Sequence, residues 1–473
     1  MQIKIALPKG RLLRKTAALL QGANWRLDEY YAKAGFYHPK SERFPNLLIK
    51  VFHEKDIPIQ VAVGNYDLGI CGLDWVEELL AKYPSSALVK IKSLGYGGGT
   101  LYMAASSTQA IFGVTQLRPK SGIIRIASEY PNMAESFALK NRLARFSIFP
   151  VWGAAEVYPP ESADLALISG RTEAEFYTCS MTPVGKVLDF GAFLIANRSS
   201  WGANDLGEIV ASICDNALAG EKHPPAQAAT RKPETTGVYY AREMDRDVVK
   251  LALPDGHQQL PTINLLNKAG IQVDDYPSST GNRRPAAGLE WVRVKAIRPQ
   301  DMPLQVANGN FDLAITGKDW LMEHRYQFPS SPVKELLDLR YGKVRIVAVV
   351  SQELPASGIS DLRRIIAEKS VPFRIASEYV NIADKYARDS HLEHYRVIPT
   401  WGATEAFLPE DADLLIENTQ TGRTIAKHNL KIIDTLFEST ACLIGYKTGK
   451  YSSVKKERVK SIVEKLQTAV EGI

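Results

Sequence analysis

The hexapeptide Arg-Ile-Ala-Ser-Glu-Tyr occurs twice in the chain, at residues 125–130 and again at residues 374–379. In both places a short apolar run leads into polar residues and then into a helical pattern, which is typical of a strand that enters a helix. An identical hexapeptide in a chain of 473 residues indicates internal duplication, because similarity at a fixed spacing marks a repeated structural unit.

Further motifs recur in the same order in both halves of the chain. The matched pairs are residues 6–11 and 252–257, 65–70 and 310–315, 72–75 and 317–320, and 152–156 and 401–405. Matched residue numbers differ by 245 to 249, so the copies are collinear with few gaps. This period is far too long for a solenoid. The chain is therefore predicted to hold two domain-sized copies of one unit.

The boundaries of the two copies follow from these matches. The first unit is predicted to span residues 1–218 and the second residues 247–473. Residues 219–246 begin with a stretch rich in Pro, Ala and Thr and show no hydrophobic periodicity, which indicates a linker. Each unit is expected to end in an amphipathic helix, at about residues 205–218 and 454–470.

Short apolar runs alternate with helical patterns inside each unit. Residues 3–7 predict a strand and 12–20 a helix, and residues 68–70 predict a strand and 74–81 a helix. This alternation predicts an α/β fold with mostly parallel sheets and right-handed crossovers. Such sheets bind ligands at the carboxyl ends of their strands.

The composition argues against several classes of protein. Hydrophobic residues make up 45% of the chain and charged residues 23%, as in globular proteins with a sizeable core. The isolated cysteines favour a reducing cytoplasm, and the N-terminus lacks a signal-peptide pattern. Apolar stretches long enough for a membrane span and long Lys/Arg runs typical of nucleic-acid binding are both absent from the sequence. The net charge of +6 fits an anionic small molecule.

Two cations flank a glycine where the first strand meets the first helix. Lys9 and Arg11 stand on either side of Gly10, where free backbone N–H groups and the helix dipole favour an anion. The alternative is an ordinary turn with solvated cations. In the second copy Asp255 and His257 replace the two cations.

A glycine run forms a second candidate loop. Gly97, Gly98 and Gly99 would let a ligand approach the backbone closely, or would simply form a flexible hinge or hairpin. The second copy has lost this run.

A polar loop follows the apolar run at residues 412–416. Its hydroxyl, guanidinium and backbone groups can surround a phosphate, although a polar loop that caps a helix is the alternative. The phosphate-binding candidates are Thr421, Gly422, Arg423 and Thr424. Glu417 could accept hydrogen bonds from ribose hydroxyls. The first copy has a shorter loop at residues 168–172, without an acidic residue at the position of Glu417.

In this order the motifs resemble those of the ATP phosphoribosyltransferases, which catalyse the first step of histidine biosynthesis. The resemblance covers nearly all of both units. It implies that each unit has a fold like the type II periplasmic binding proteins, with two α/β lobes and a chain that returns to the first lobe. The lobes would then span about residues 1–105 plus 185–218, and 106–184, in the first unit, and 247–352 plus 432–473, and 353–431, in the second.

The resemblance also implies a reaction and roles for the candidates. N1 of the ATP adenine attacks C1 of phosphoribosyl pyrophosphate (PRPP), and pyrophosphate leaves with Mg²⁺, so positioning and cationic stabilisation would carry catalysis. Lys9 and Arg11 would face pyrophosphate or phosphate, residues 421–424 would hold the 5-phosphate, and Glu417 would contact the ribose. Two glutamates match a family glutamate near the same pocket: Glu156 and Glu405.

The resemblance bears on partners as well. After Tyr446 a single helix is predicted, so the chain resembles the family's short form, without the histidine-binding domain, written twice. Short forms work with a histidyl-tRNA-synthetase-like regulatory subunit. The sequence predicts a cytoplasmic homo-oligomer, and it leaves open the oligomeric state, feedback by histidine and the need for that subunit.

Neither copy carries the complete pattern, and three hypotheses follow. In the first, the chain is a working ATP phosphoribosyltransferase whose sites combine contributions from both copies. In the second, one copy is active and the other is a structural or regulatory partner. In the third, the chain is a non-catalytic nucleotide- or phosphosugar-binding paralogue. The loss of different motifs from the two copies favours the first.

Two sets of matched residues have structural interpretations. The tryptophans at positions 75, 152, 320 and 401 are expected to pack in the core or between lobes rather than to stack on a ligand. Asp67 and Asp312 are expected to cap or orient loops.

Overall fold

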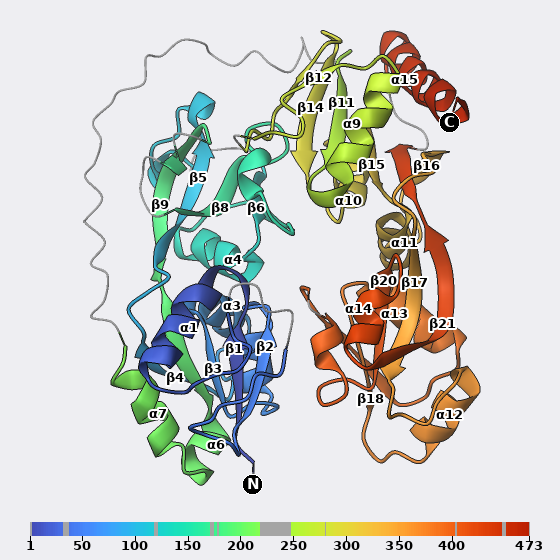
Figure 1. Ribbon diagram of the computed structural model, residues 1–473. Helices are drawn as coiled ribbons and strands as arrows, with labels where there is room; N and C mark the ends of the chain where they lie inside the picture. The colour runs from blue at the N-terminus through green and yellow to red at the C-terminus, as the bar shows by residue number, and fades with distance from the viewer. Residues whose placement is uncertain are drawn as a thin grey trace. The chain divides into compact units, whose positions relative to one another are not determined.

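The computed structural model describes residues 2–31, 37–117, 122–170, 175–176, 179–217, 247–279, 281–402, 404–446 and 451–472 (Figure 1). The predicted linker at residues 219–246 lies outside these residues, as do Arg171 and Thr172 of the shortened loop. No described helix is long and apolar enough to cross a membrane.

The chain forms two compact units, each built mainly from one copy. Unit 1 comprises Met1–Pro150, Tyr158–Glu234 and Trp401–Ala406, and unit 2 comprises Val151–Val157, Thr235–Thr400 and Phe407–Ile473. Each unit thus includes a short segment of the other copy. These two segments occupy matched positions in the copies. Val151–Val157 directly follows β7 (Phe146–Pro150), and Trp401–Ala406 begins two residues after the end of the matched strand β19 (Tyr395–Pro399).

The first lobe of unit 1 is a five-stranded sheet with the order β2-β1-β3-β10-β4. β1 pairs in parallel with β2 and β3, whereas β10 runs antiparallel to β3 and β4. Its strands are β1 (Lys4–Pro8), β2 (Leu48–Phe52), β3 (Leu68–Gly72), β4 (Leu88–Ser93) and β10 (Ala192–Asn197). Its helices are η1 (Gly10–Leu12), α1 (Leu13–Gly22), α2 (Ile57–Ala62), α3 (Leu73–Lys82), α6 (Arg198–Ala203) and α7 (Gly207–Cys214).

The second lobe of unit 1 is a five-stranded sheet with the order β7-β6-β8-β5-β9. β6 pairs in parallel with β7 and β8, and β5 runs antiparallel to β8 and β9. Its remaining elements are β5 (Gly99–Ser106), η2 (Ser107–Gln109), η3 (Val114–Gln116), β6 (Ile124–Ser128), α4 (Pro131–Lys140), β8 (Leu165–Gly170) and β9 (Met181–Phe190).

The chain crosses between the lobes twice. It enters the second lobe between β4 and β5 and returns between β9 and β10, which only Gly191 separates. β5 begins at Gly99 and pairs with β9 along its whole length, so the first crossing lies before residue 99. The sequence had predicted this crossing near residue 105.

Unit 2 repeats both sheets, with the orders β14-β11-β15-β22-β16 and β19-β18-β20-β17-β21. The first-lobe elements are β11 (Val249–Pro254), η5 (Gly256–Gln258), α9 (Gln259–Lys268), β12 (Val273–Asp274), β13 (Ala286–Ala287), β14 (Val292–Ile297), α10 (Met302–Ala307), β15 (Leu313–Gly317), α11 (Lys318–Gln327), β16 (Val333–Asp338), β22 (Ala441–Tyr446) and α15 (Ser453–Glu471). The second-lobe elements are β17 (Val344–Ser351), α12 (Ile359–Ala367), β18 (Phe373–Ser377), α13 (Val380–Asp389), β20 (Leu414–Thr419), α14 (Arg423–Lys427) and β21 (Leu430–Ser439). η4 (Ala155–Val157) belongs to unit 2, and η6 (Thr404–Phe407) begins in the segment of unit 1.

The sequence explains why these strands are central. Every residue of β3 and of the matched strand β15 is buried, as expected for a strand covered by helices on both faces. α1 and α7 contribute Leu19, Ile209 and Ile213 to the core on one face of the first sheet. The α/β fold with two copies of a two-lobed, type II periplasmic-binding-protein-like unit is as predicted. Asp67 and Asp312, which were expected to cap or orient loops, each accept a hydrogen bond from the backbone near the start of a strand, β1 or β11.

The two lobes of unit 1 are joined by a buried carboxylate. Glu78 on α3 accepts hydrogen bonds from the backbone N–H groups of Asn132 and Met133, at 3.0 and 2.9 Å, in the first turn of α4. Burial raises the pKa of Glu78, and these hydrogen bonds counteract the rise. Unit 2 repeats the contact, with Glu323 on α11 accepting from the first turn of α13. A helix of one lobe therefore caps a helix of the other in both units.

Replacing this carboxylate is expected to destabilise unit 1. In Glu78→Gln one amide oxygen replaces two carboxylate oxygens, and an NH2 group then faces N–H donors, so the free energy of unfolding should fall by about 1–2 kcal/mol. Urea unfolding measures the change. Glu77→Gln is the matched control, because Glu77 forms a surface ion pair with Lys90 and its replacement should cost about 0–1 kcal/mol. Equal losses in the two variants would contradict the capping role.

Candidate functional site

Lys9 directly follows β1, at the carboxyl end of this strand. Parallel sheets bind their ligands at this end of their strands. Its backbone N–H donates to the carbonyl of Phe52 at 2.8 Å, which fixes the turn against the end of β2. Gly10 then adopts a φ of +79°, a left-handed conformation that glycine adopts without strain. The Lys9 ammonium lies 5.6 Å from the centre of the Tyr37 ring.

Arg11 binds carboxylates of its own lobe. Its Nε donates to Glu54 at 2.7 Å, and its Nη2 donates to both oxygens of Asp74 at 2.8 and 2.7 Å. Burial opposes the charged form, but the two carboxylates raise the pKa of Arg11 above its ordinary value. The guanidinium also lies over the Phe190 ring, 4.9 Å from its centre. Arg11 thus links the first turn to the start of α3, whereas the resemblance implied that it faces pyrophosphate.

The same cluster joins Arg11 to the second lobe. Asp74 is fully buried and accepts a hydrogen bond from the Tyr130 hydroxyl at 2.8 Å. In unit 2 the matched Asp319 accepts from Tyr379 at 2.7 Å. There Ser439, at the position of Phe190, donates to Asp319 at 2.8 Å. A serine hydroxyl therefore supplies the second copy with a hydrogen bond that Arg11 supplies in the first.

Removing the Arg11 guanidinium is expected to destabilise the chain. Arg11→Met leaves the buried Asp74 carboxylate with the Tyr130 hydroxyl alone and Glu54 without its cation, so the free energy of unfolding should fall by about 3 kcal/mol. The matched control is His257→Met in the exposed, equivalent position of unit 2, with an expected change of about 0.5 kcal/mol or less. Urea unfolding compares the two, and similar losses would show that Arg11 is not the anchor described.

Lys55 and His53 follow β2 beside this cluster. The Lys55 ammonium pairs with Glu129 at 2.9 Å and lies 4.6 Å from the centre of the Trp75 ring. Trp75 stacks in turn on Tyr130, with ring centres 4.3 Å apart, so it packs between the lobes as predicted. Burial and the neighbouring cations, Lys55 first, lower the pKa of His53 to about 4. Its Nδ1 accepts from the Lys55 backbone N–H at 3.3 Å, which requires a neutral ring with its proton on Nε2.

The stability of the chain should depend on pH through His53. Its folded-state pKa of about 4 lies below the ordinary value of 6.5, so its contribution is complete above pH 6.5 and is lost as the pH falls towards 4. Urea unfolding between pH 7.5 and 4.5 should show a fall that His53→Gln reduces by up to about 2 kcal/mol.

A second histidine provides the comparison for this measurement. Burial lowers the pKa of His324 to about 4 as well, and this histidine lies in α11 of unit 2. His324→Gln should therefore remove a separate part of the pH dependence, and the double variant should remove both. A pH dependence that neither substitution alters would rule out this origin.

The glycine run of the first copy is in close contact with the unit's own core. A Cβ added to Gly97, which has a φ of +66°, would lie 2.3 Å from a methyl group of Leu12. A Cβ added to Gly99 would lie 2.7 Å from the Phe190 ring. Packing around the lobe crossing therefore accounts for Gly97 and Gly99, and Gly98 lies between them.

Unit 2 presents the complete polar loop between β20 and α14. The Thr419 hydroxyl accepts from the Gly422 backbone N–H at 2.9 Å, and Gly422 has a φ of +75°. The three side chains of Thr421, Arg423 and Thr424 are exposed. Glu417, near the end of β20, accepts from the Asn418 backbone N–H. Asn418 donates to Tyr379 at 3.0 Å, so this loop is tied to the interlobe cluster through a residue that the sequence analysis did not select.

The two glutamates of the matched pair lie in the exchanged segments. Glu405 belongs to unit 1, where it accepts a hydrogen bond from the Tyr37 hydroxyl at 2.7 Å. Because the Lys9 ammonium lies against the same Tyr37 ring, the structure brings together Lys9 and Glu405, which the sequence separates by almost the whole chain. Tyr37 belongs to no motif, and only its neighbours in space reveal it.

The segment Val151–Val157, which contains Glu156, belongs to unit 2. The backbone N–H of Trp152 donates to both carboxylate oxygens of Asp301, at 3.1 and 3.2 Å. The buried Lys295 ammonium donates to the carbonyl of Val157 at 2.9 Å. The Trp152 ring lies 5.7 Å from the Trp320 ring. Three residues of the second copy thus anchor a segment of the first.

A side chain of opposite charge replaces Lys9 in unit 2. Asp255 lies at the carboxyl end of β11 and pairs with Arg283 and Arg298. This is the replacement that the matched positions of the two copies show in the sequence. Among the described residues, no group of three or more His, Cys, Asp or Glu side chains could hold a metal ion.

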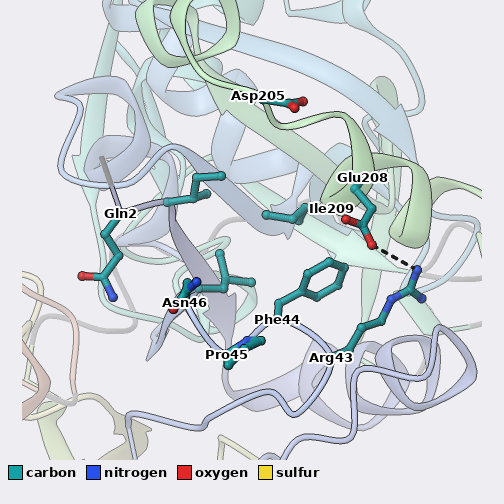
Figure 2. A pocket seen from close by; sticks show the side chains of 10 residues that line it. Gln2, Arg43, Phe44, Pro45, Asn46, Asp205, Glu208 and Ile209 are labelled. Carbon is teal, nitrogen blue, oxygen red and sulfur yellow. Dashed lines mark ion pairs between the residues drawn. The ribbon is translucent and has the colours of Figure 1, made fainter.

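A cavity of about 580 Å³ lies at the opposite end of the first sheet of unit 1. Ile3 and Leu47, which line it, precede β1 and β2, whereas Lys9 follows β1. Figure 2 shows Phe44 at its centre and the ion pair between Arg43 and Glu208, whose charged atoms lie 3.8 Å apart. The cavity is therefore separate from the predicted site residues.

Cations, carboxylates and hydroxyl-bearing loops at the ends of parallel strands are typical of α/β proteins that bind phosphorylated small molecules. Residues 53–216 and 298–468 match the ATP phosphoribosyltransferase family, HisG. The chain belongs to this family.

Individual relatives match one copy's length of the chain. The ATP phosphoribosyltransferase of Chlorobaculum parvum is 32% identical over 229 residues, which are 47% of this chain and 72% of that protein. The enzyme of the same name from Thermodesulfovibrio yellowstonii is 31% identical over 232 residues, 48% of this chain and 74% of that protein. A chain of the ATP phosphoribosyl transferase (HisG:HisZ) complex from Thermotoga maritima is similar in structure, with 24% identity, a TM-score of 0.39, and coverage of 48% of this chain and 100% of that chain.

Proposed function

We propose that the chain transfers the phosphoribosyl group of PRPP to N1 of ATP in histidine biosynthesis. The bond from adenine N1 to C1 of the ribose forms, the bond from C1 to the pyrophosphate oxygen breaks, and pyrophosphate leaves with the Mg²⁺ that accompanies PRPP. The observation that carries this proposal is the grouping of Lys9, Tyr37 and Glu405 in unit 1. This group combines Lys9, from a family motif of the first copy, with Glu405, the matched glutamate of the second copy.

The chemistry of this group suits the departure of pyrophosphate. Lys9 is a partly buried cation at the carboxyl end of a parallel strand, so its charge would stabilise the anion that develops as the C1–O bond breaks. The Tyr37 ring supports the Lys9 ammonium, and its hydroxyl orients Glu405. These residues act by positioning and by charge, without a covalent intermediate.

Unit 2 contributes the other half of the family pattern. The exposed hydroxyl and guanidinium groups of residues 421–424 would bind the 5-phosphate of PRPP, and Glu417 would accept hydrogen bonds from the ribose. We propose that activity requires both halves, because each unit includes a segment of the other copy and neither copy has the full set. We also propose that the chain self-associates and that it works with a regulatory subunit like histidyl-tRNA synthetase.

A second candidate function is favoured by the pairing of charges. Arg11 is bound to Glu54 and Asp74, and Asp255 stands in unit 2 where unit 1 has Lys9. Both features reduce the positive charge available to pyrophosphate. A paralogue that binds a nucleotide or phosphosugar without turnover would tolerate them.

The assay measures pyrophosphate release and the N1 adduct of ATP, with purified chain, ATP, PRPP and Mg²⁺. We expect turnover in the presence of Mg²⁺. Lys9→Ala and Thr421→Ala should each reduce kcat/KM by about 100-fold, because each removes a charge or hydrogen bond to a phosphate. Arg14→Ala, an exposed cation of α1, is the control and should retain activity.

Three results would change the conclusion. If one of the two substitutions is nearly silent while the other abolishes activity, a single copy carries the reaction. If the chain binds PRPP tightly without releasing pyrophosphate, the binding paralogue is correct. If Arg14→Ala is as damaging as Lys9→Ala, the position of Lys9 at the strand end has no special role.

A further inference from the structure

Asp255 in unit 2 is a buried carboxylate held by two arginines. Its side chain is 6% exposed, and each of its oxygens has its own guanidinium partner. Arg283 Nη1 lies 2.5 Å from Oδ2, and Arg298 Nη1 lies 3.2 Å from Oδ1. The Arg283 and Arg298 side chains are 29% and 43% exposed, so both are accessible to solvent.

The backbone shows which residues of unit 1 these three replace. The N–H of Asp255 donates to the carbonyl of Ile297 as that of Lys9 donates to Phe52, so Arg298 takes the place of His53. The N–H of Ala296 donates to the carbonyl of Arg283 as that of Val51 donates to Tyr37, so Arg283 takes the place of Tyr37. One cation has become an anion, and two neighbouring positions have become cations.

The pattern is that of an anion site. Two guanidinium groups that converge on two oxygens are a usual arrangement for binding phosphate, because each donor group pairs with a separate oxygen. Without a central anion the two like charges would repel each other at close range. Here the central anion is a side chain of the protein.

Two further cations of this lobe bind the segment contributed by the first copy. Arg284 and Lys295 both donate to the carbonyl of Val157, at 3.0 and 2.9 Å, in the segment contributed by the first copy. A Cβ added to Gly153 of that segment would lie 3.1 Å from Nε of Arg298, so the backbone of this segment passes close to the guanidinium.

We propose that the first lobe of unit 2 contains a binding site for anions of the phosphate class, formed by Arg283 and Arg298, and that the Asp255 carboxylate occupies this site. The site is closed to free phosphate and pyrophosphate in the natural chain, whereas the matched turn of unit 1 carries Lys9. The proposal rests on the proposed function only in its choice of pyrophosphate as the probe, since binding and turnover are measured separately.

The test opens the site and asks whether an external anion takes the place of the carboxylate. Asp255→Ala is made in the full chain with Lys9→Ala as the background, so that the turn of unit 1 does not contribute. Calorimetric titration with pyrophosphate, in the absence of ATP and PRPP, should show at least a ten-fold gain in affinity over the Lys9→Ala chain. Saturating pyrophosphate should also raise the Tm of this variant more than sodium chloride of equal ionic strength.

Two further variants keep the test decisive. Asp255→Asn keeps the size of the side chain and removes its charge, so it should show a smaller gain if Asp255→Ala does not fold. Adding Arg298→Ala to either variant should abolish the gain. An affinity for pyrophosphate that is unchanged by both substitutions of Asp255, or a gain that survives the loss of Arg298, would overturn the proposal. Neither result depends on whether the chain catalyses phosphoribosyl transfer.

Discussion

The hydrogen bonds from the start of one helix to a buried carboxylate on another hold each unit in its shape. Glu78 on α3 caps α4, and one turn earlier Asp74 binds the Tyr130 hydroxyl. The same carboxylates, as Glu323 and Asp319, recur in unit 2. These carboxylates hold the ends of parallel strands from the two lobes close together. A buried carboxylate is stable only when hydrogen-bond donors satisfy its oxygens. Lys9 and residues 421–424 depend on this geometry, since they follow strands whose ends these contacts position.

The two copies satisfy this constraint with different side chains. Unit 1 fills the space around Asp74 with Arg11, Glu54 and Phe190, whereas unit 2 uses Ser439 for Asp319. Replacing a cation beside a buried carboxylate requires another donor, so the changes at Arg11 and Phe190 are coupled. The divergence of the copies is thus a set of matched substitutions that preserves the fold. What it alters is the charge that each unit presents at its strand ends.

The sequence was sufficient for the fold because the repeat is long and its strands are continuous apolar runs, such as residues 68–72. It also predicted Lys9 and residues 421–424 as site residues from their positions after predicted strands, and these roles stay predictions. It could not identify Tyr37 or pair it with Glu405, because that contact joins residues far apart in the chain and Tyr37 belongs to no motif. It did not show that Arg11 binds Glu54 and Asp74, because the buried partners of a cation are invisible in a single sequence. Where the chain crosses between lobes depended on the pairing of β5 with β9, which spacing alone does not determine.

The exchanged segments have a consequence for the synthesis of the protein on the ribosome. Unit 1 consists almost entirely of residues up to 234, yet it is complete only when Trp401–Ala406 has been translated. Unit 2 needs Val151–Val157, which is made long before its own strands. Until that segment has been made, Tyr37 lacks its glutamate, so unit 1 keeps one hydrogen-bond partner open while most of unit 2 is being translated.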